Sequence, residues 1–349
     1  MSRFLNRELM RLTPYTPGEQ PQGGGYVKLN TNESPFPPSG GVLNAIGKAE
    51  AEKLNLYSDP TLNPVVSALA GRFSVENKNV YAGNGSDEVL AIAMYAFGEN
   101  GFTYPDITYG FYGVIANFFG IDCVRPQLKD DFTIDIHDYM GNDRAVIIAN
   151  PNAPTGICLP LSDIEKILIA NPDQVVIIDE AYVEFGGESA SALIPKYDNL
   201  LVVGTFSKAW NLAGARLGYA VGNEELISDL NRLRYSFHPY NINRLTLLAG
   251  KAAVEDENYY IACRKKIMET RQRVQERLIR LGFTCTPSKA NFIFARPPRG
   301  DAERIYKALY ERKVLVRYFP SGRTKEYLRI SIGSDCQMDA FLSALEAVL

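Results

Sequence analysis

Gly204-Thr-Phe-Ser-Lys-Ala-Trp-Asn-Leu-Ala-Gly-Ala-Arg-Leu-Gly218 is the stretch that decides the fold. It follows Asn199-Leu-Leu-Val-Val203, a short apolar run rich in β-branched residues, which predicts a buried strand. That strand runs directly into Lys208, and open α/β sheets bind their ligands at the carboxyl ends of their strands. We therefore expect a ligand site around the amine of Lys208.

Three polar side chains accompany this lysine. Thr205 and Ser207 come just before Lys208, and Arg216 follows eight residues later. Two hydroxyls and a guanidinium suit a phosphate monoester held beside an amine. A phosphate joined to an aldehyde describes pyridoxal phosphate, which binds covalently to a lysine. The competing interpretation is a solvated lysine at a strand end, and a bare Ser-Lys pair would favour it.

The composition limits the classes of protein to which the chain can belong. Its 349 residues suggest about two domains. Hydrophobic residues make up 46% and charged residues 22%, which is ordinary for a soluble protein. The net charge of −3 gives no reason to expect nucleic acid or a membrane surface as a partner.

Cysteine and histidine usage argues against a metal centre. Only His137 and His238 are present, and no two cysteines form a C-x-x-C pair. The odd number of cysteines indicates reduced, buried thiols and a cytoplasmic protein. Residues 1–10 carry charges within their apolar run, so we predict no secretory signal, and no long apolar stretch predicts a membrane span. The five cysteines are Cys123, Cys158, Cys263, Cys285 and Cys336.

The chain divides into three predicted parts. Residues 1–40 are rich in proline and glycine and predict an extended arm, which we expect to pack with the small domain and with a partner subunit. Residues 41–245 predict a large α/β domain that starts with helices over 42–56 and 64–73. Residues 246–349 predict a small α+β domain, entered through a charged helical connector over 242–281.

Strand, loop and helix repeat through the large part, which predicts a mainly parallel sheet with helices on both faces. Three successive strands end in Asn150-Pro-Asn-Ala-Pro-Thr-Gly156, Asp179-Glu-Ala-Tyr182 and Thr205-Phe-Ser-Lys208. Because the carboxyl ends of parallel strands share one edge, these polar side chains should converge there.

Two further stretches suit a phosphorylated aromatic ligand. Gly83-Asn-Gly-Ser-Asp-Glu88 precedes an apolar helical run, so free backbone N–H groups at a helix start could bind a phosphate. The alternative is that Ser86 or Asp87 simply caps that helix. Pro105-Asp-Ile-Thr-Tyr-Gly-Phe-Tyr112 is dense in aromatics, and a tyrosine there could stack on a ring or pack in the core.

Taken in order, these motifs resemble the fold-type I pyridoxal-phosphate aminotransferases, and within them the histidinol-phosphate aminotransferase branch. The resemblance runs nearly from end to end and implies a large, mainly parallel sheet domain, a smaller α+β domain and a homodimer. Its marks are Leu12–Gly18, Leu29–Pro35, Gly83–Glu88, Asn150–Gly156, Asp179–Tyr182, Ser207–Arg216, Asn291–Arg296 and Leu328–Gly333.

The resemblance implies a role for each cofactor-binding residue. Lys208 would bond to the cofactor and carry the transferred proton, and Asp179 would pair with the pyridine nitrogen. Tyr182 would hydrogen-bond the ring oxygen, while Tyr109 would stack on the ring. Tyr57 would reach the phosphate from the partner subunit. The remaining phosphate ligands would be Ser86, Asp87, Thr205, Ser207 and Arg216.

On the substrate side, Arg329 resembles the arginine that binds an α-carboxylate, and Arg317 resembles the family's phosphate-binding arginine. Tyr15 would close over the substrate's imidazole, and Asn32 is a further expected substrate contact. One departure concerns the asparagine that contacts the ring oxygen in many relatives, because Ala153 stands in its place. We assign that role to the neighbouring Asn152.

Four functions remain open at this point. The favoured one is transamination between L-histidinol phosphate and 2-oxoglutarate, giving imidazole acetol phosphate and L-glutamate in histidine biosynthesis. The second is an aromatic amino acid aminotransferase, and the third is a threonine-phosphate decarboxylase, whose motifs are shared. The fourth, a regulatory module that binds the cofactor without catalysis, is disfavoured because no DNA-binding extension precedes the arm.

Overall fold

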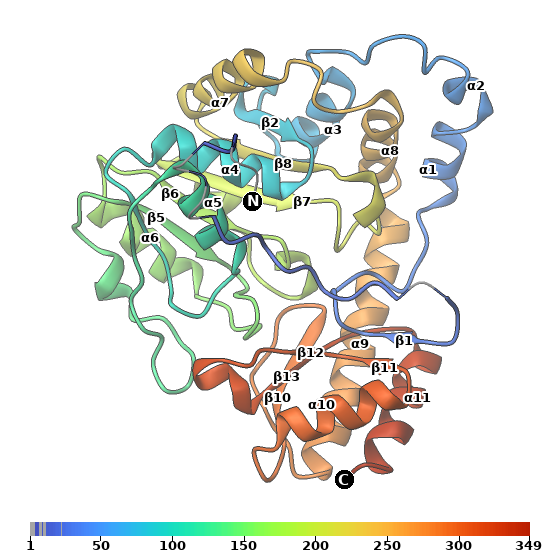
Figure 1. The fold of residues 1–349 in the computed structure, drawn as a ribbon. Helices are drawn as coiled ribbons and strands as arrows, with labels where there is room; N and C mark the ends of the chain where they lie inside the picture. Colours follow the sequence, from blue (N-terminus) through green and yellow to red (C-terminus); the bar gives the residue numbers. More distant parts are fainter. Residues whose placement is uncertain (1–3, 7–8, 10–11, 22) are drawn as a thin grey trace.

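The computed structural model describes residues 4–6, 9, 12–21 and 23–349. Residues 1–3, 7, 8 and 10 of the stretch 1–10, on which the prediction of no secretory signal rests, lie outside the described residues, as do residues 11 and 22 of the arm. Figure 1 shows a larger unit around one sheet and a smaller unit that carries the C-terminus, with helix α9 (Glu257–Arg280) running from one to the other.

Among the described residues, seven strands form the large sheet in the order β2-β8-β7-β6-β5-β3-β4. The strands from β7 to β4 are mutually parallel, and β8 is antiparallel to both of its neighbours. The expected large, mainly parallel sheet domain is therefore confirmed. The bounds are β2 Val80–Gly83, β3 Phe102–Thr103, β4 Cys123–Val124, β5 Ala145–Ala149, β6 Val176–Asp179, β7 Leu200–Thr205 and β8 Gly218–Gly222.

The sheet is buried on both faces, because alternate residues of each strand enter different apolar clusters. In β6, Ile177 faces the cluster that α4, α5 and α7 complete, whereas Ile178 faces the cluster that α3, α6, α8 and α9 complete. Because helices cover both faces of the sheet, its strands consist of near-continuous hydrophobic runs. The bounds are α3 Asn63–Phe73, α4 Ser86–Phe97, α5 Phe111–Phe119, α6 Leu161–Ala170, α7 Glu224–Phe237 and α8 Arg244–Glu255.

The smaller unit is a four-stranded antiparallel sheet, in the order β12-β13-β10-β9, together with two helices. The arm joins it, since β1 (Val27–Lys28) pairs in parallel with β11 (Val314–Leu315). This pairing attaches the arm to the smaller unit. The bounds are β9 Thr284–Cys285, β10 Phe292–Arg296, α10 Ala302–Glu311, β12 Arg317–Tyr318, β13 Leu328–Ser331 and α11 Asp335–Glu346.

Two predicted helices differ from the observed ones. The predicted helix over 42–56 is wrong in length, because it consists of α1 (Gly40–Ala45) and α2 (Lys48–Ala51) with Gly47 between them. The connector over 242–281 is two helices that meet at Asp256. Of these, α8 packs on α1 and α3, beside the large sheet, although the predicted boundary at 245 would assign it to the small domain.

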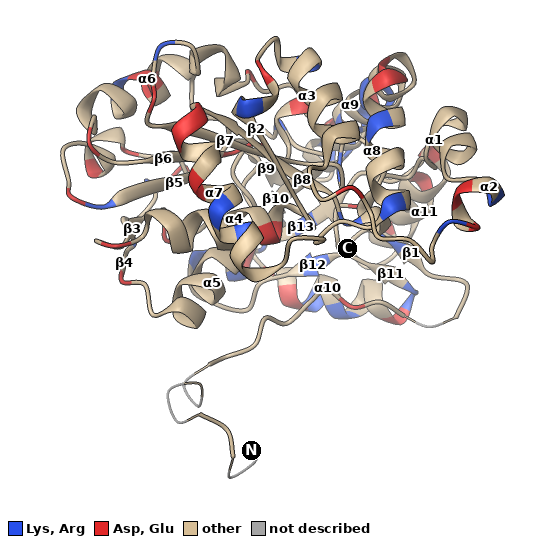
Figure 2. Cartoon of the chain, turned by 90° about the horizontal axis from the view of Figure 1, so that it is seen from above, with Lys and Arg blue, Asp and Glu red and all other residues tan. Residues whose placement is uncertain are grey.

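The charged surface of α9 is paired within the chain. Arg273 pairs with Asp335 and Asp339, and Arg277 pairs with Glu346. Figure 2 shows basic and acidic segments interspersed over the helices rather than gathered by sign. In the described part of the chain, no helix has the length and apolar character needed to cross a bilayer.

The described cysteines are all free thiols. The expectation of buried thiols holds for Cys263 but is wrong for Cys336, which is exposed in the first turn of α11.

Candidate active site

A cavity of about 570 Å³ lies at the carboxyl ends of β5, β6 and β7. The ends of these strands are aligned, because Ala149 of β5 pairs with Asp179 of β6, which in turn pairs with Val203 of β7. Residues of the arm and of the smaller unit complete the lining. The three loops that the sequence predicts to converge therefore border one cavity.

Lys208 lies three residues beyond the end of β7 and lines this cavity. Its Nζ atom donates a hydrogen bond to the backbone carbonyl of Thr31 at 3.1 Å, and it lies 5.9 Å from the centre of the Tyr182 ring. The amine is thus held at the cavity by a neutral acceptor rather than by a carboxylate.

Asp179 is the last residue of β6, and it is buried. Its Oδ2 atom accepts a hydrogen bond from the Tyr112 hydroxyl at 2.6 Å, and Oδ1 accepts one from the Ala181 N–H at 3.1 Å. Burial raises the pKa of Asp179 to about 6 in spite of these two bonds. Such a carboxylate is poised to pair with a buried cation, for example a protonated pyridine nitrogen.

A phosphate-sized cradle lies at the start of α4. Gly85, which precedes the helix, has φ +88° and provides no side-chain cap, so the first N–H groups of α4 are not capped by its side chain. A Cβ atom at Gly85 would lie 2.6 Å from Nη2 of Arg216, and one at Gly218 would lie 2.3 Å from the backbone nitrogen of Ser86. Only glycine permits this close approach.

Charged and hydroxyl groups surround the cradle. Arg216 donates to Asp87 at 3.1 Å and to the Ser207 hydroxyl at 3.4 Å. The Thr205 hydroxyl accepts from the Ser207 N–H at 3.1 Å. The predicted phosphate ligands Ser86, Asp87, Thr205, Ser207 and Arg216 all line the cavity, so the structure brings this set together.

Two tyrosines of the site come from the aromatic stretch that leads into α5, with Tyr109 just before the helix and Tyr112 in its first turn. The Tyr109 hydroxyl donates to Asp87 Oδ1 at 2.9 Å, and its ring lies 5.5 Å from that of Tyr112 at 89°. Sequence analysis identifies Tyr109 but misses Tyr112, the residue that holds Asp179. The spacing of three residues at a helix start, which places the two side chains on one side, is the signal that could have found it.

Two arginines face the cavity from the smaller unit. Arg317 of β12 and Arg329 of β13 are directly opposite each other in the antiparallel pair, and both line the cavity. Arg329 donates to the Asn30 carbonyl at 3.0 Å, but its buried Nε has no hydrogen-bond partner among the described residues. Burial, together with the positive charge of Arg317, lowers the pKa of Arg329. Like charges in directly opposite positions destabilise a sheet, and a bound anion would relieve that repulsion.

The arm closes one side of the cavity. Tyr15 lines it and contacts the ring of Phe111 edge-on, with centroids 5.5 Å apart. Arg317 donates to the Thr16 carbonyl at 3.5 Å, and the Asn30 amide donates to the Glu19 carbonyl at 3.0 Å. The chain's own Tyr15 therefore reaches the cavity.

Asn152 does not line the cavity, contrary to the role assigned to it. Its amide nitrogen donates to the Ile107 carbonyl and to Thr155, and its oxygen accepts from Thr108 at 2.8 Å. These bonds hold the loop, and Ala153 takes the lining position. The shift by one residue turns the side chain away from the site.

Tyr57 also lies outside the lining. Its side chain is 79% exposed and stacks on Tyr240 with centroids 4.6 Å apart. The described chain alone therefore does not bring Tyr57 to its own cavity.

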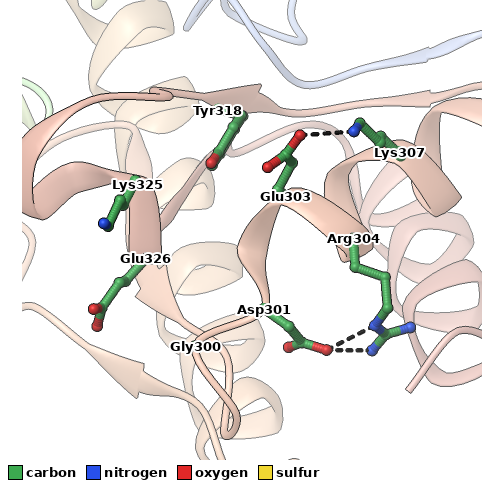
Figure 3. A pocket seen from close by; sticks show the side chains of 8 residues that line it. All are labelled: Gly300, Asp301, Glu303, Arg304, Lys307, Tyr318, Lys325 and Glu326. Atoms are coloured by element: carbon green, nitrogen blue, oxygen red, sulfur yellow. Dashed lines mark hydrogen bonds and ion pairs between the residues drawn. The ribbon is translucent and has the colours of Figure 1, made fainter.

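A second hollow lies between α10 and the segment Gly322–Glu326 (Figure 3). Most of its charges are already paired, since Asp301 binds Arg304, Glu303 binds Lys307 and Glu326 binds Arg296. It therefore presents no unpartnered charge cluster comparable to that of the first cavity. Within the described residues, no group of three or more histidine, cysteine or acidic side chains is arranged to hold a metal ion.

Known proteins resemble this chain in sequence and in fold. The model of the family described as "Aminotransferase class I and II" matches residues 25–345. The chain belongs to this aminotransferase family. It is 48% identical to the histidinol-phosphate aminotransferase of Marinomonas sp., with 100% of both chains covered, and 46% identical to that of Brachyspira hyodysenteriae, with 100% of this chain and 99% of the relative covered.

A solved structure of the family has the same fold. The histidinol-phosphate aminotransferase of Sinorhizobium meliloti, solved in complex with pyridoxal-5'-phosphate, superposes with a TM-score of 0.90 at 25% identity, covering 100% of this chain and 98% of that one. The aminotransferases of this family depend on pyridoxal phosphate, and the site described above fits that cofactor. The glycine-lined cradle suits its phosphate, and the buried Asp179 suits its ring nitrogen.

The raised pKa of Asp179 predicts how stability depends on pH in the protein without cofactor. The folded state holds this proton up to about pH 6, and the unfolded state loses it near 3.8. The stabilisation is therefore fully present below about pH 3.8 and is lost as the pH rises through about 6. Cofactor-free Asp179→Asn, which keeps an acceptor for Tyr112, should gain stability over the wild type across this window.

Urea denaturation of both proteins between pH 4 and pH 8 measures the effect. The difference in free energy of unfolding between Asp179→Asn and the wild type should grow in favour of the variant by a few kcal/mol as the pH rises, because one pKa unit corresponds to about 1.4 kcal/mol. Asp163→Asn, at a half-buried surface position on α6, serves as the control and should show no comparable change. A difference between Asp179→Asn and wild type that stays constant with pH would show that Asp179 has an ordinary pKa.

Proposed function

We propose that this protein transfers the amino group of L-histidinol phosphate to 2-oxoglutarate, giving imidazole acetol phosphate and L-glutamate. The relatives that match over the whole chain carry this name, and family membership supports an aminotransferase. The observation that carries the substrate choice is the pair Arg317 and Arg329, facing each other across β12 and β13 at the cavity. The proposed reaction belongs to histidine biosynthesis, and we propose that it takes place in the cytoplasm.

Two guanidiniums suit both substrates of this reaction. Histidinol phosphate has no α-carboxylate and carries a phosphate ester in its place, whereas 2-oxoglutarate carries two carboxylates. Both must occupy the same slot in turn. Arginine binds phosphate and carboxylate through the same planar arrangement of donors, and the unpartnered Nε of Arg329 leaves a donor for such a ligand.

Each residue of the site then has a defined task. When bound, pyridoxal phosphate acts as an electron sink for the carbon that bears the amino group. Asp179 keeps the ring nitrogen protonated through a charge-assisted hydrogen bond. The Nζ atom of Lys208 would accept the proton from the substrate carbon. Tyr109 and Tyr15 line the cavity, so with cofactor and substrate bound Tyr109 would cover the ring and Tyr15 would cover the imidazole and exclude water.

The proposal includes a homodimer. Tyr57 is exposed on a loop that is tied to the rest of the chain, since Ser58 donates to the Ile242 carbonyl and the buried Arg234 donates to the Pro60 carbonyl. A rigid loop that presents an exposed aromatic side chain is suited to contact a second copy. We infer that Tyr57 reaches the phosphate of the partner's cofactor.

Arg317→Ala tests the substrate assignment. Loss of one cation from a desolvated anion site should cost about 2–5 kcal/mol of transition-state binding for histidinol phosphate, or roughly 30-fold or more in kcat/KM. Phenylalanine, which lacks the phosphate, should lose much less. The measurement is kcat/KM for both donors with 2-oxoglutarate.

The matched control is Arg312→Ala, an exposed arginine that precedes β11 and does not line the cavity. It should leave both donors unaffected. Equal losses for the two donors in Arg317→Ala would assign Arg317 a general structural role and would favour an aromatic amino acid aminotransferase.

Mixing two inactive variants tests the shared site. In heterodimers of Lys208→Ala with Tyr57→Ala, one of the two sites combines an intact Lys208 with an intact Tyr57 from the other chain. Equal mixing should therefore restore activity in about a quarter of all sites.

Mixing Lys208→Ala with Asp179→Ala is the control, because both residues belong to the same chain's site and every heterodimer site lacks one of them. No recovery is expected there. Equal recovery in the two mixtures, or a fully active monomer in sedimentation, would refute the shared site.

A further inference from the structure

Asn32 of the arm forms a closed hydrogen-bond ring with Ser331 of β13. The Asn32 N–H donates to Ser331 Oγ at 2.9 Å, and Ser331 Oγ donates to Asn32 Oδ1 at 2.8 Å. A serine hydroxyl has one hydrogen. Since its oxygen already accepts from the backbone, that hydrogen is available for Oδ1, and the orientation of the Asn32 amide is fixed.

The fixed amide leaves its nitrogen facing Tyr182. Nδ2 of Asn32 donates to the Tyr182 hydroxyl oxygen at 2.9 Å. A tyrosine hydroxyl also has one hydrogen. Because its oxygen accepts from an amide that offers only a donor on this side, the Tyr182 hydrogen must point elsewhere, and Tyr182 lines the cavity.

Several contacts hold Asn32 rigidly. Its backbone is in the left-handed region at φ 57°, which asparagine tolerates better than most residues. Its carbonyl accepts from Nδ2 of Asn291 at 2.9 Å. Asn32, Ser331 and Asn291 are each at most 3% exposed, so water does not compete for these bonds.

The site also lacks an amide where the family's pattern provides one. Ala153 lines the cavity, and Asn152 uses both atoms of its amide in hydrogen bonds to Ile107 and Thr108 of the neighbouring loop. Among the described residues of this loop, no side-chain amide is therefore left to donate to the ring oxygen of a bound cofactor. Tyr182 has to supply that hydrogen bond without a neighbouring amide from the loop.

We propose that Asn32, fixed by Ser331, is a positioning residue that directs the hydrogen of the Tyr182 hydroxyl onto the ring oxygen of pyridoxal phosphate. Asn32 thereby compensates, by acting through Tyr182, for the side-chain amide that is missing at position 153. The assignment rests on the proposed function only in requiring that the cofactor binds with its ring oxygen beside Tyr182. It reassigns Asn32 from an expected substrate contact to a residue that acts through Tyr182.

The absorbance of the bound cofactor reports this hydrogen bond. A hydroxyl that donates to the ring oxygen stabilises the form in which that oxygen bears its full negative charge. It therefore lowers the pH at which the bound chromophore loses its proton. Removing or reversing the bond should raise the midpoint of the spectral pH titration, and no turnover is needed for this measurement.

The decisive variants are Tyr182→Phe, Asn32→Asp and the two combined. Tyr182→Phe removes the hydrogen and should raise the spectral midpoint by about one pH unit or more. Asn32→Asp tolerates the same backbone conformation but offers only an acceptor, so it should attract the Tyr182 hydrogen away from the ring and raise the midpoint similarly. In the Tyr182→Phe background, Asn32→Asp should add much less, because only its charge then acts.

Ser331 provides an independent variant pair. Ser331→Ala frees the Asn32 amide to turn and should raise the midpoint, whereas Ser331→Thr keeps the hydroxyl and should return it toward the wild-type value. Equal effects of Asn32→Asp with and without the Tyr182 hydroxyl, or equal midpoints for the two Ser331 variants, would overturn the proposal. If Tyr182→Phe itself leaves the midpoint unchanged, the cofactor placement in the proposed function fails instead.

Discussion

The alignment of β5, β6 and β7 is the constraint on which the site depends. Parallel pairing puts Ala149, Asp179 and Val203 in one row across the sheet, so the loops that follow the three strands begin at the same edge. A one-residue slip in any of these pairs would reverse which face each side chain occupies and would move Asp179 away from Tyr112. The close approach at Gly218 then fixes the start of α4 against β8 and completes the phosphate cradle.

The second half of the site comes from the smaller unit, which contributes two positively charged side chains. The opposed Arg317 and Arg329 repel each other in the absence of an anion, and burial of Arg329 adds to that cost. In the described part of the arm, the carbonyls of Thr16 and Asn30, which are neutral, accept hydrogen bonds from these cations. Among the described residues neither arginine forms an ion pair with a carboxylate, so their positive charge is available at the cavity for anionic substrates. Asn32 joins the two halves, because it bonds both to the small sheet and to the loop after β6.

Sequence reasoning predicted the sheet edge and the lysine site well, because strand periodicity and loop position follow from local patterns. The buried strand expected over 199–203 and the position of Lys208 at a cavity agree with the structure. It failed where the direction of a side chain depends on tertiary contacts. Asn152 turns toward Thr108 of the neighbouring loop, a contact that leaves no mark in the local sequence, and the contact of Tyr112 with Asp179 is signalled only by the spacing of three residues between Tyr112 and Tyr109. The antiparallel strand β8 was missed for a similar reason, since pairing direction is set by neighbouring strands rather than by periodicity.

The central claim is that this cavity selects a phosphate-bearing amino donor for transamination. The most direct measurement compares histidinol phosphate, phenylalanine and O-phosphothreonine with the holoenzyme and 2-oxoglutarate, following both glutamate formation and release of carbon dioxide. The account predicts the highest kcat/KM for histidinol phosphate, with glutamate as product and no carbon dioxide. A preference for phenylalanine, or release of carbon dioxide from O-phosphothreonine without glutamate formation, would contradict it.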